Sequence, residues 1–155
     1  MEKLEIGSRV PGFTLKDQDG KLFDLNNALG RKNLVIYFYP KDETAGCTAQ
    51  ACSFRDDYEE FLQLNAEVIG ISSDSPESHR NFAQKHRLPF ILLSDPDQSV
   101  RKKFGVPGSL MGLIPGRTTY IVDKEGNIRH IFTSQLGVKK HVEIALNVIR
   151  ELTEN

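Results

Sequence analysis

Two buried strands joined through a helix constrain the fold of this chain more than any other feature of its sequence. Residues 33–39 and 66–72 are runs rich in β-branched, aliphatic and aromatic side chains, which is typical of buried strands. Residues 53–62 between them have the spacing of an amphipathic helix. Because consecutive strands joined by a helix run parallel, the sequence predicts an α/β fold built around this unit.

The rest of the chain also alternates between strand-like and helix-like spacing. The other predicted elements are, in chain order, a β-hairpin of residues 12–15 and 21–25, a helix opened by Ser75 and Pro76, a helix opened by a capping box at residues 95–98 and ending near Gly105, strands at 118–122 and 128–132, and a helix over 139–152. A chain of 155 residues can bury a core without disulfides or metal. We therefore predict a single domain, residues 1–155, with a central mixed β-sheet flanked by helices and an N-terminal hairpin.

The charge balance argues against several classes of partner. The chain has 20 Lys and Arg against 21 Asp and Glu, and nucleic acid or an anionic membrane would need a concentrated basic face. The basic run at residues 101–103 is expected to be a solvated helix face. No apolar run reaches membrane length, and the first residues lack the pattern of a secretory signal, so we expect a cytoplasmic protein.

Both cysteines, Cys47 and Cys52, lie where the first buried strand leads into the helix. The N–H groups of a first helical turn lack intrahelical partners and carry partial positive charge, so a thiolate at Cys47 would be stabilised there. A reducing compartment disfavours a permanent disulfide, which leaves a redox-active or a metal-binding pair. The alternative for Cys47 alone is a small buried hydrophobic side chain without chemistry.

A zinc site is disfavoured, because two cysteines would need two further ligands. The four histidines occur singly, without paired spacing, and each is expected at the surface or its boundary: His79, His86, His130 and His141. We therefore expect no metal and no cofactor.

The spacing of the two cysteines has a geometric consequence. If residues 44–52 are helical, the two side chains lie about 140° apart around the axis and roughly 7.5 Å apart along it. A disulfide requires Cα atoms within about 7 Å and converging Cβ atoms, so this pair cannot bridge while the helix is intact. Either the two cysteines never bridge, or bridging unwinds the helix.

Peroxide reduction suits a pair in which one cysteine reacts first and alone. A thiolate attacks the O–O bond, becomes a sulfenic acid, and condenses with a second thiol to form a disulfide. A thioredoxin-like dithiol exchanger carries Cys-x-x-Cys instead, and this chain lacks that motif. Two alternatives stay open: a protein dithiol–disulfide oxidoreductase, and a non-catalytic redox sensor whose helix unwinds on oxidation.

Pro40, Thr44 and Cys47 form a Pro-x-x-x-Thr-x-x-Cys motif, which resembles the active-site signature of the peroxiredoxins. Cys52, five residues further on, and the short chain are similar to the branch of the bacterioferritin comigratory protein and peroxiredoxin Q. The resemblance covers most of the chain, from residue 7 to residue 123. It implies a thioredoxin-like fold and the reduction of hydrogen peroxide and organic hydroperoxides.

The resemblance also implies roles for the matching residues. These are Cys47 as the peroxidatic cysteine, Cys52 as the resolving cysteine in an intrachain disulfide, Thr44 as the hydroxyl that binds peroxide oxygen, Pro40 as a shield against water, and Arg117 as the cation that holds the thiolate, with Gly46 completing the substrate contacts. Recycling by thioredoxin or a similar dithiol and a monomeric state are implied as well. Without the resemblance, Thr44 would be a helix N-cap and Arg117 an ordinary loop arginine.

Two positions, Ala45 and Gln50, differ from the proline and glutamate that the resemblance leads us to expect. Loss of the proline removes some pre-organisation of the turn, and loss of the glutamate removes a proton carrier near the thiol. Both changes leave the nucleophile and its partners in place, so they bear on the rate and fine mechanism more than on the reaction class. Arg55 is expected to be structural, as one member of an ion pair with a nearby acid. In the loop of residues 104–117, the apolar side chains of residues 110–114 are expected to pack on the core or to line a shallow pocket.

Overall fold

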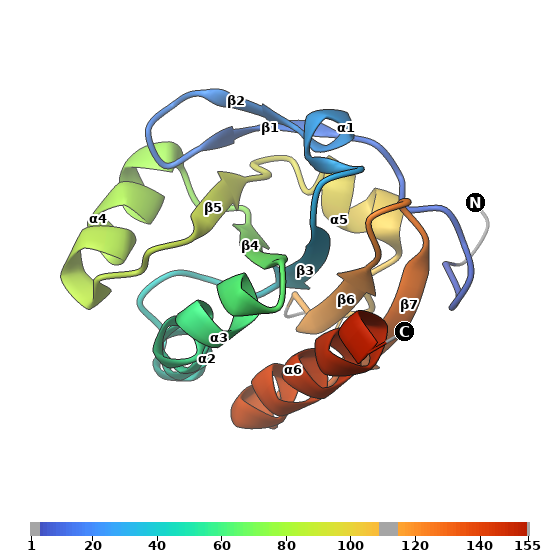
Figure 1. Ribbon diagram of the computed structural model, residues 1–155. Helices are drawn as coiled ribbons and strands as arrows, with labels where there is room; N and C mark the ends of the chain where they lie inside the picture. The colour runs from blue at the N-terminus through green and yellow to red at the C-terminus, as the bar shows by residue number, and fades with distance from the viewer. Residues whose placement is uncertain (1–3, 109–114, 155) are drawn as a thin grey trace.

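The computed structural model describes residues 4–108 and 115–154 (Figure 1). The strands are β1 (Thr14–Asp17), β2 (Leu22–Asp24), β3 (Asn33–Phe38), β4 (Ala66–Ser72), β5 (Ile91–Ser94), β6 (Thr118–Val122) and β7 (Ile128–Thr133). The helices are α1 (Leu25–Ala28), α2 (Ala45–Asp56), α3 (Tyr58–Gln63), α4 (Pro76–His86), α5 (Ser99–Phe104) and α6 (Val138–Glu154). None of the helices in this described part of the chain is long and apolar enough to cross a membrane.

The strands of the described chain form one sheet in the order β2-β1-β5-β4-β3-β6-β7 (Figure 1). Strands β3, β4 and β5 run parallel, whereas β6 pairs antiparallel with β3 and β7 pairs antiparallel with β6. The hairpin of β1 and β2 adds to the edge at β5. The predicted mixed sheet, its N-terminal hairpin and the parallel pair of β3 and β4 are therefore confirmed.

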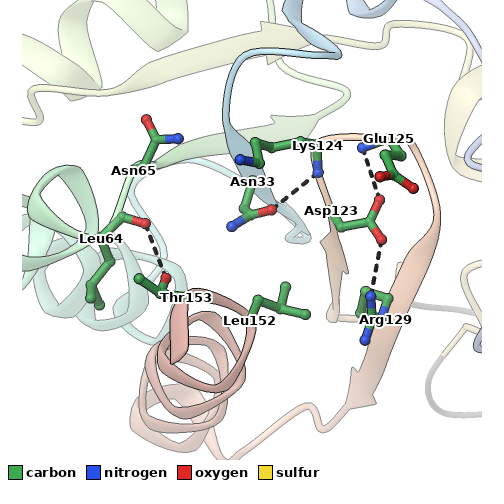
Figure 2. A pocket seen from close by; sticks show the side chains of 9 residues that line it. All are labelled: Asn33, Leu64, Asn65, Asp123, Lys124, Glu125, Arg129, Leu152 and Thr153. Atoms are coloured by element: carbon green, nitrogen blue, oxygen red, sulfur yellow. Dashed lines mark hydrogen bonds and ion pairs between the residues drawn. The ribbon is translucent and has the colours of Figure 1, made fainter. Parts of the chain in front are cut away.

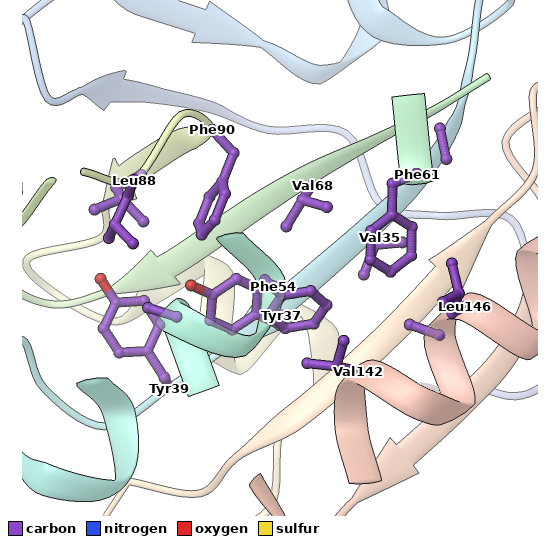
Figure 3. Packing of buried hydrophobic residues seen from close by; sticks show 14 of the residues in the cluster. Val35, Tyr37, Tyr39, Phe54, Phe61, Val68, Leu88, Phe90, Val142 and Leu146 are labelled. Atoms are coloured by element: carbon purple, nitrogen blue, oxygen red, sulfur yellow. The ribbon is translucent and has the colours of Figure 1, made fainter. Parts of the chain in front are cut away.

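Strand β3 is apolar along its length because it separates two cores. Val35 and Tyr37 face a cluster that includes side chains from α2, α3, α4 and α6, and the ring of Phe54 from α2 stacks on Tyr37 with centroids 4.6 Å apart (Figure 3). Leu34 and Ile36 point the other way, into a cluster formed with the N-terminal segment and α5. Side chains alternate between the two faces of a strand, so burial on both sides demands a continuous apolar run.

Two predicted helices have different ends in the structure. Asp57 adopts a non-helical conformation (φ −102°, ψ 5°) and divides the segment predicted at 53–62 between α2 and α3. The prediction of a capping box at residues 95–98 was wrong, because the backbone of Gln98 is left-handed (φ 60°) and α5 begins after it. Asp95 instead accepts hydrogen bonds from the N–H groups of Val100 and Arg101, which caps α5 from outside the helix.

Three polar side chains expected at the surface lie in the interior. His79 and His141 are fully buried, and Arg101 is only 6% exposed, so the prediction of a solvated basic helix face was wrong for Arg101. Each of the three finds its hydrogen-bond partners on segments distant in sequence, which local spacing cannot show.

Strand β5 was not predicted, because a four-residue apolar run carries little periodicity. The apolar side chains of residues 110–114 lie outside the described residues.

Candidate active site

The turn between β3 and α2 delivers Cys47 to the first turn of a helix. Thr44 occupies the N-cap position with an extended backbone (φ −81°, ψ 153°), and the N–H of Thr48 donates to its carbonyl at 2.8 Å. Cys47 is the third residue of α2 and is 1% exposed. The unpaired N–H groups of a first turn favour negative charge, so this position suits a thiolate, as the sequence predicts.

Arg117 reaches Cys47 from a segment 70 residues later in the chain. It directly precedes β6, whose antiparallel register pairs Thr118 with Phe38 and so places the start of β6 beside the end of β3. The guanidinium Nη2 donates to Cys47 Sγ at 3.4 Å, and Arg117 is 4% exposed. A fixed cation therefore lies in hydrogen-bond contact with the thiol, which an ordinary loop arginine would not do.

Two further contacts orient the Arg117 guanidinium. Its Nε donates to the carbonyl of Gln135 at 3.2 Å, and its Nη1 donates to Gln50 Oε1. Gln50 is fully buried and lies three residues after Cys47, on the same face of α2. The sequence did not predict this contact between Gln50 and Arg117. Its neutral amide holds the guanidinium without neutralising the positive charge.

The buried polar atoms without a partner among the described residues include Gln50 Nε2 and the Tyr37 hydroxyl. Burial raises the pKa of Tyr37 well above its usual value, and the charge of Cys47 is the next largest cause. The phenol therefore stays neutral and keeps its proton. Gln50 and Tyr37 thus leave an N–H and an O–H group uncommitted close to Cys47 and Arg117.

The loop before α2 contributes the other predicted site residues. The Thr44 hydroxyl donates to the carbonyl of Lys41 at 2.9 Å and does not cap the helix, so its hydrogen does not point to a substrate and its lone pairs stay free to accept. Pro40 is half-buried at the end of β3. At Gly46, an added Cβ would lie 3.2 Å from Arg117 Nη2. The absence of a side chain at Gly46 therefore leaves room for the close approach of the guanidinium.

Cys52 lies in the same unbroken helix as Cys47, which spans Ala45–Asp56. Both thiols are free, Cys47 buried and Cys52 half-buried. The helical geometry assumed from the sequence is confirmed, so a bond between the two sulfurs requires α2 to unwind. Arg55, on the same helix, pairs with Asp56 and donates to the carbonyl of His86, away from Cys47.

A buried histidine supports the segment around Arg117. His141 Nε2 donates to the carbonyl of Ser134 at 2.8 Å, and its Nδ1 accepts from the hydroxyl of Thr119 at 2.7 Å. Ser134 in turn donates its N–H to the carbonyl of Arg117 at 3.2 Å. Burial lowers the pKa of His141 to about 4, so the imidazole is neutral near pH 7. This connection between α6 and β6 was not predicted, because no local spacing marks it.

A second buried network anchors the loop at its other end. Asp42 accepts hydrogen bonds from the hydroxyl of Tyr39, from Ser78 Oγ at 2.9 Å and from His79 Nδ1 at 2.7 Å. His79 Nε2 lies 3.0 Å from the carbonyl of Leu93. The carbonyl of Leu93 can only accept, so Nε2 is the donor in this contact. The network ties the loop before α2 to α4 and β5.

Asp42 and His79, together with Asp74, place their ligand atoms within 4.8 Å of one another, as the one such cluster found in residues 4–108 and 115–154. These atoms already form hydrogen bonds within the protein. Asp74 Oδ2 accepts from the Asp42 N–H at 2.8 Å and from the Ser72 hydroxyl at 2.6 Å. The cluster is therefore explained as part of the hydrogen-bond network that fixes the loop.

A polar hollow of about 490 Å³ lies at the other end of the sheet (Figure 2). Its wall includes Asn33, the first residue of β3, whereas the cysteine site lies beyond the last. Asn33 accepts from the N–H of Lys124, and Asp123 pairs with Arg129 at 3.2 Å. These contacts tie parts of the wall together, and the hollow lies at the end of the sheet away from the cysteine site.

The AhpC/TSA family matches residues 6–131, which include both cysteines and Arg117. The chain belongs to the AhpC/TSA family. Chloroplastic peroxiredoxin Q proteins of Triticum aestivum and Populus jackii are 53% and 51% identical over 150 residues, which is 97% of this chain and 69% and 70% of theirs. The resemblance to the peroxiredoxin Q branch is confirmed, and with it the activity of a thiol-dependent peroxidase.

Solved structures of the same branch share the fold of this family member. Peroxidoxin BcpB of Mycobacterium tuberculosis superposes with a TM-score of 0.88 at 35% identity, covering 96% of this chain and 98% of that one. Peroxiredoxin Q of Xanthomonas campestris gives a TM-score of 0.83 at 31% identity, covering 91% of each chain. The predicted thioredoxin-like fold is therefore confirmed.

Proposed function

We propose that Cys47 is the nucleophile of this peroxidase. Its thiolate attacks one oxygen of a hydroperoxide, the O–O bond breaks, and the sulfur takes the OH group as a sulfenic acid. The other oxygen leaves as hydroxide or alkoxide and takes a proton from solvent. The single observation that carries this proposal is the hydrogen bond of 3.4 Å from Arg117 Nη2 to Cys47 Sγ at the N-terminus of α2.

The surrounding residues stabilise charge as the reaction proceeds. Negative charge shifts from sulfur to the leaving oxygen, so Arg117 and the N–H groups of Gly46 and Cys47 serve as donors in the transition state. The Thr44 oxygen accepts from the hydroperoxide O–H, since its own hydrogen is committed to the carbonyl of Lys41. Pro40 limits access of water to the thiolate.

Cys52 resolves the sulfenic acid in the second step. Its thiolate attacks the sulfur of Cys47, the S–O bond breaks, and the oxygen leaves as water after protonation, which forms an intrachain disulfide. The shared helix supports a step that is coupled to unwinding of α2, because the intact helix holds the two side chains apart.

Hydrogen peroxide and organic hydroperoxides are the proposed substrates, and thioredoxin or a similar dithiol is the proposed reductant. Support for the organic substrates comes from the bacterioferritin comigratory protein of Xanthomonas campestris, which is described for its alkyl peroxide reduction activity and is 30% identical to this chain. The reductant attacks the disulfide and leaves both cysteines as thiols, so the cycle needs no cofactor. We further propose that the protein acts as a monomer in the cytoplasm.

Substitution of each cysteine tests the assignment. Cys47→Ser is expected to abolish peroxide consumption, and Cys52→Ser is expected to allow one turnover that ends in a sulfenic acid trapped by dimedone. Mass mapping of the wild-type protein after one equivalent of peroxide should find a bond between Cys47 and Cys52. A Cys47→Ser protein with full activity would refute the proposal. Sustained turnover with thioredoxin distinguishes the enzyme from a sensor, which is oxidised once.

A further inference from the structure

A second buried arginine lies behind the cysteine site. Arg101 is on α5, a helix whose apolar residues face the core opposite to the one that contains Cys47. Its guanidinium reaches the end of β3, where Nη2 donates to the carbonyl of Tyr39 at 2.8 Å. Its Nη1 donates to the carbonyl of Gly116 at 2.7 Å. The side chain thus joins two backbone segments that are far apart in the sequence.

Each of these two carbonyls immediately precedes a residue of the proposed site. Tyr39 precedes Pro40, where the active-site loop begins, and Gly116 precedes Arg117. The peptide that carries the Gly116 carbonyl also carries the N–H of Arg117, so a displacement of this peptide moves the Cα of Arg117. One planar guanidinium therefore fixes both the start of the loop and the base of the Arg117 side chain.

The surroundings of Arg101 suit a positioning role. Its Cζ lies 5.6 Å from the centre of the Phe38 ring, and its backbone N–H donates to Asp95 Oδ2 at 2.9 Å. Within the described residues no carboxylate forms an ion pair with its guanidinium. The backbone it holds is closely packed, because a Cβ added at Gly116 would lie 1.7 Å from the carbonyl oxygen of Pro107. Small displacements there have no space to be absorbed.

We propose that Arg101 is a positioning residue of the peroxidase site, which holds Arg117 in contact with Cys47 by clamping the backbone in front of Pro40 and Arg117. This inference rests on the proposed role of Arg117. It goes beyond that role because Arg101 touches neither sulfur nor substrate and acts through two carbonyl oxygens. The arrangement requires the forked guanidinium, since a lysine ammonium is a point charge that does not reproduce two parallel contacts.

The charged groups around Arg101 must be considered when the pH dependence of Cys47 reactivity is interpreted. Arg101 interacts electrostatically with Asp95 from the loop after β5, with Cys47 from α2 and with Tyr120 from β6. Cys47 itself faces Arg117, Arg101 and Tyr37. Loss of Arg101 therefore removes a nearby charge in addition to the clamp, and the experiment must separate the two effects.

The test uses the Cys52→Ser variant as its background, because Cys47 is then the one remaining cysteine and its oxidation and alkylation can be measured directly. Two quantities are measured: the rate constant for oxidation by hydrogen peroxide, and the pH midpoint of alkylation by iodoacetamide. Arg101→Met is expected to lower the rate constant by about tenfold or more and to raise the pH midpoint. Arg101→Lys keeps the charge but not the fork, and is expected to lower the rate with a smaller shift in midpoint. Lys102→Met, exposed on the same helix, is the matched control and is expected to match the background.

A double variant shows whether Arg101 acts through Arg117. Arg117→Met should lower the rate by about a hundredfold, and adding Arg101→Met should cause little further loss. Losses that multiply in the double variant, or a background-level rate in Arg101→Met, would overturn the inference. If Arg101→Met does not fold, Arg101→Lys decides, because unchanged rate and midpoint there exclude the clamp. A background-level rate in Arg117→Met would refute the proposed function instead.

Discussion

Helices α2 and α6 pack on the same face of the sheet but bury very different side chains (Figures 1 and 3). Over its 17 residues, α6 buries an apolar stripe of Val142, Ala145, Leu146 and Ile149, and each fully buried large aliphatic side chain contributes about 1.5–3 kcal/mol. The first two turns of α2 bury small or polar groups instead, and its one large buried side chain is Phe54.

This difference suggests separate roles, in which α6 stabilises the fold and α2 carries the cysteines. Unwinding the first turns of α2 exposes little apolar surface, because Cys47, Gln50 and Ala51 are the buried side chains there. The same motion in α6 would expose a large part of one core. In the proposed cycle α2 opens while α6 continues to cover the sheet, which fits the small apolar surface that the first turns of α2 bury.

Disulfide formation should distinguish the two helices most strongly. We expect amide hydrogen exchange in residues 45–52 to accelerate by about a hundredfold or more on oxidation, because the bond cannot form in an intact helix, while residues 138–154 keep their protection. Hydrogen–deuterium exchange with mass spectrometry measures both segments in one sample. Peroxide-treated Cys52→Ser is the control and should show no acceleration. Equal protection of residues 45–52 in the two redox states would contradict a helix that unwinds.

Truncation in the apolar stripe of α6 should lower stability without changing the chemistry of the folded protein. Ile149→Ala is expected to reduce the free energy of unfolding by about 2–5 kcal/mol, measured by urea denaturation. The matched control is Val148→Ala, a half-buried position on the same helix, where a smaller loss is expected. The rate of Cys47 oxidation in the folded variants should stay that of the wild type. A loss at Ile149 no larger than at Val148 would show that the stripe does not hold the fold.

Acid should weaken the contact of α6 with β6 through His141. Its pKa falls from 6.5 to about 4 on folding because burial disfavours the cation, so the unfolded chain binds the proton more readily. The stabilisation is complete above pH 6.5 and is lost as the pH falls toward 4, by roughly 3 kcal/mol in total. Urea denaturation from pH 7 to pH 4 measures this slope. His141→Gln should flatten it, and His130→Gln, at a half-buried position, should leave it unchanged. The same slope in His141→Gln would assign the acid sensitivity to other groups.

The smallest effect is expected at the start of α2, where stability and activity should move in opposite directions. Gly46→Ala favours the helix and should stabilise the reduced protein by about 0.5–1 kcal/mol. Its Cβ would lie 3.2 Å from Arg117 Nη2, so the rate constant for peroxide should fall, by about tenfold. Ala45→Gly, exposed one residue earlier, is the reciprocal control and should lower stability without affecting Arg117. An unchanged rate in Gly46→Ala would show that the guanidinium tolerates the methyl group.

Much of the fold could be predicted from local pattern. The parallel pair at the centre of the sheet was predicted from the apolar runs at 33–39 and 66–72 and the helix between them. Apolar runs and helical spacing can each be recognised within one short segment of the sequence. Short elements were less visible, and β5 and the break at Asp57 were missed. Strand β5 is stabilised by its pairing with β1 and β4, which local pattern does not show.

The candidate site was only partly visible for a similar reason. The motif of Pro40, Thr44 and Cys47 is contiguous, and the placement of Cys47 in a first helical turn follows from the strand and helix on either side. The burial of Arg101 was misjudged and the contact of Gln50 was not predicted, because a polar side chain in a helical pattern is ordinarily solvent-facing. Their partners, Arg117 and the carbonyls of Tyr39 and Gly116, arrive only when β3 and β6 pair.

The sequence by itself determined the kind of fold, the placement of Cys47 in a first helical turn, and a spacing of the two cysteines that an intact helix cannot bridge. Helical periodicity fixes the separation of Cys47 and Cys52 before any tertiary contact exists. Tertiary structure alone brought Arg117, the cation that the resemblance implied, to the sulfur and decided what holds its guanidinium in place. The antiparallel register of β3 and β6 brings Arg117 to Cys47, 70 residues earlier in the chain, and only burial makes His141 and Arg101 find their hydrogen-bond partners inside the protein.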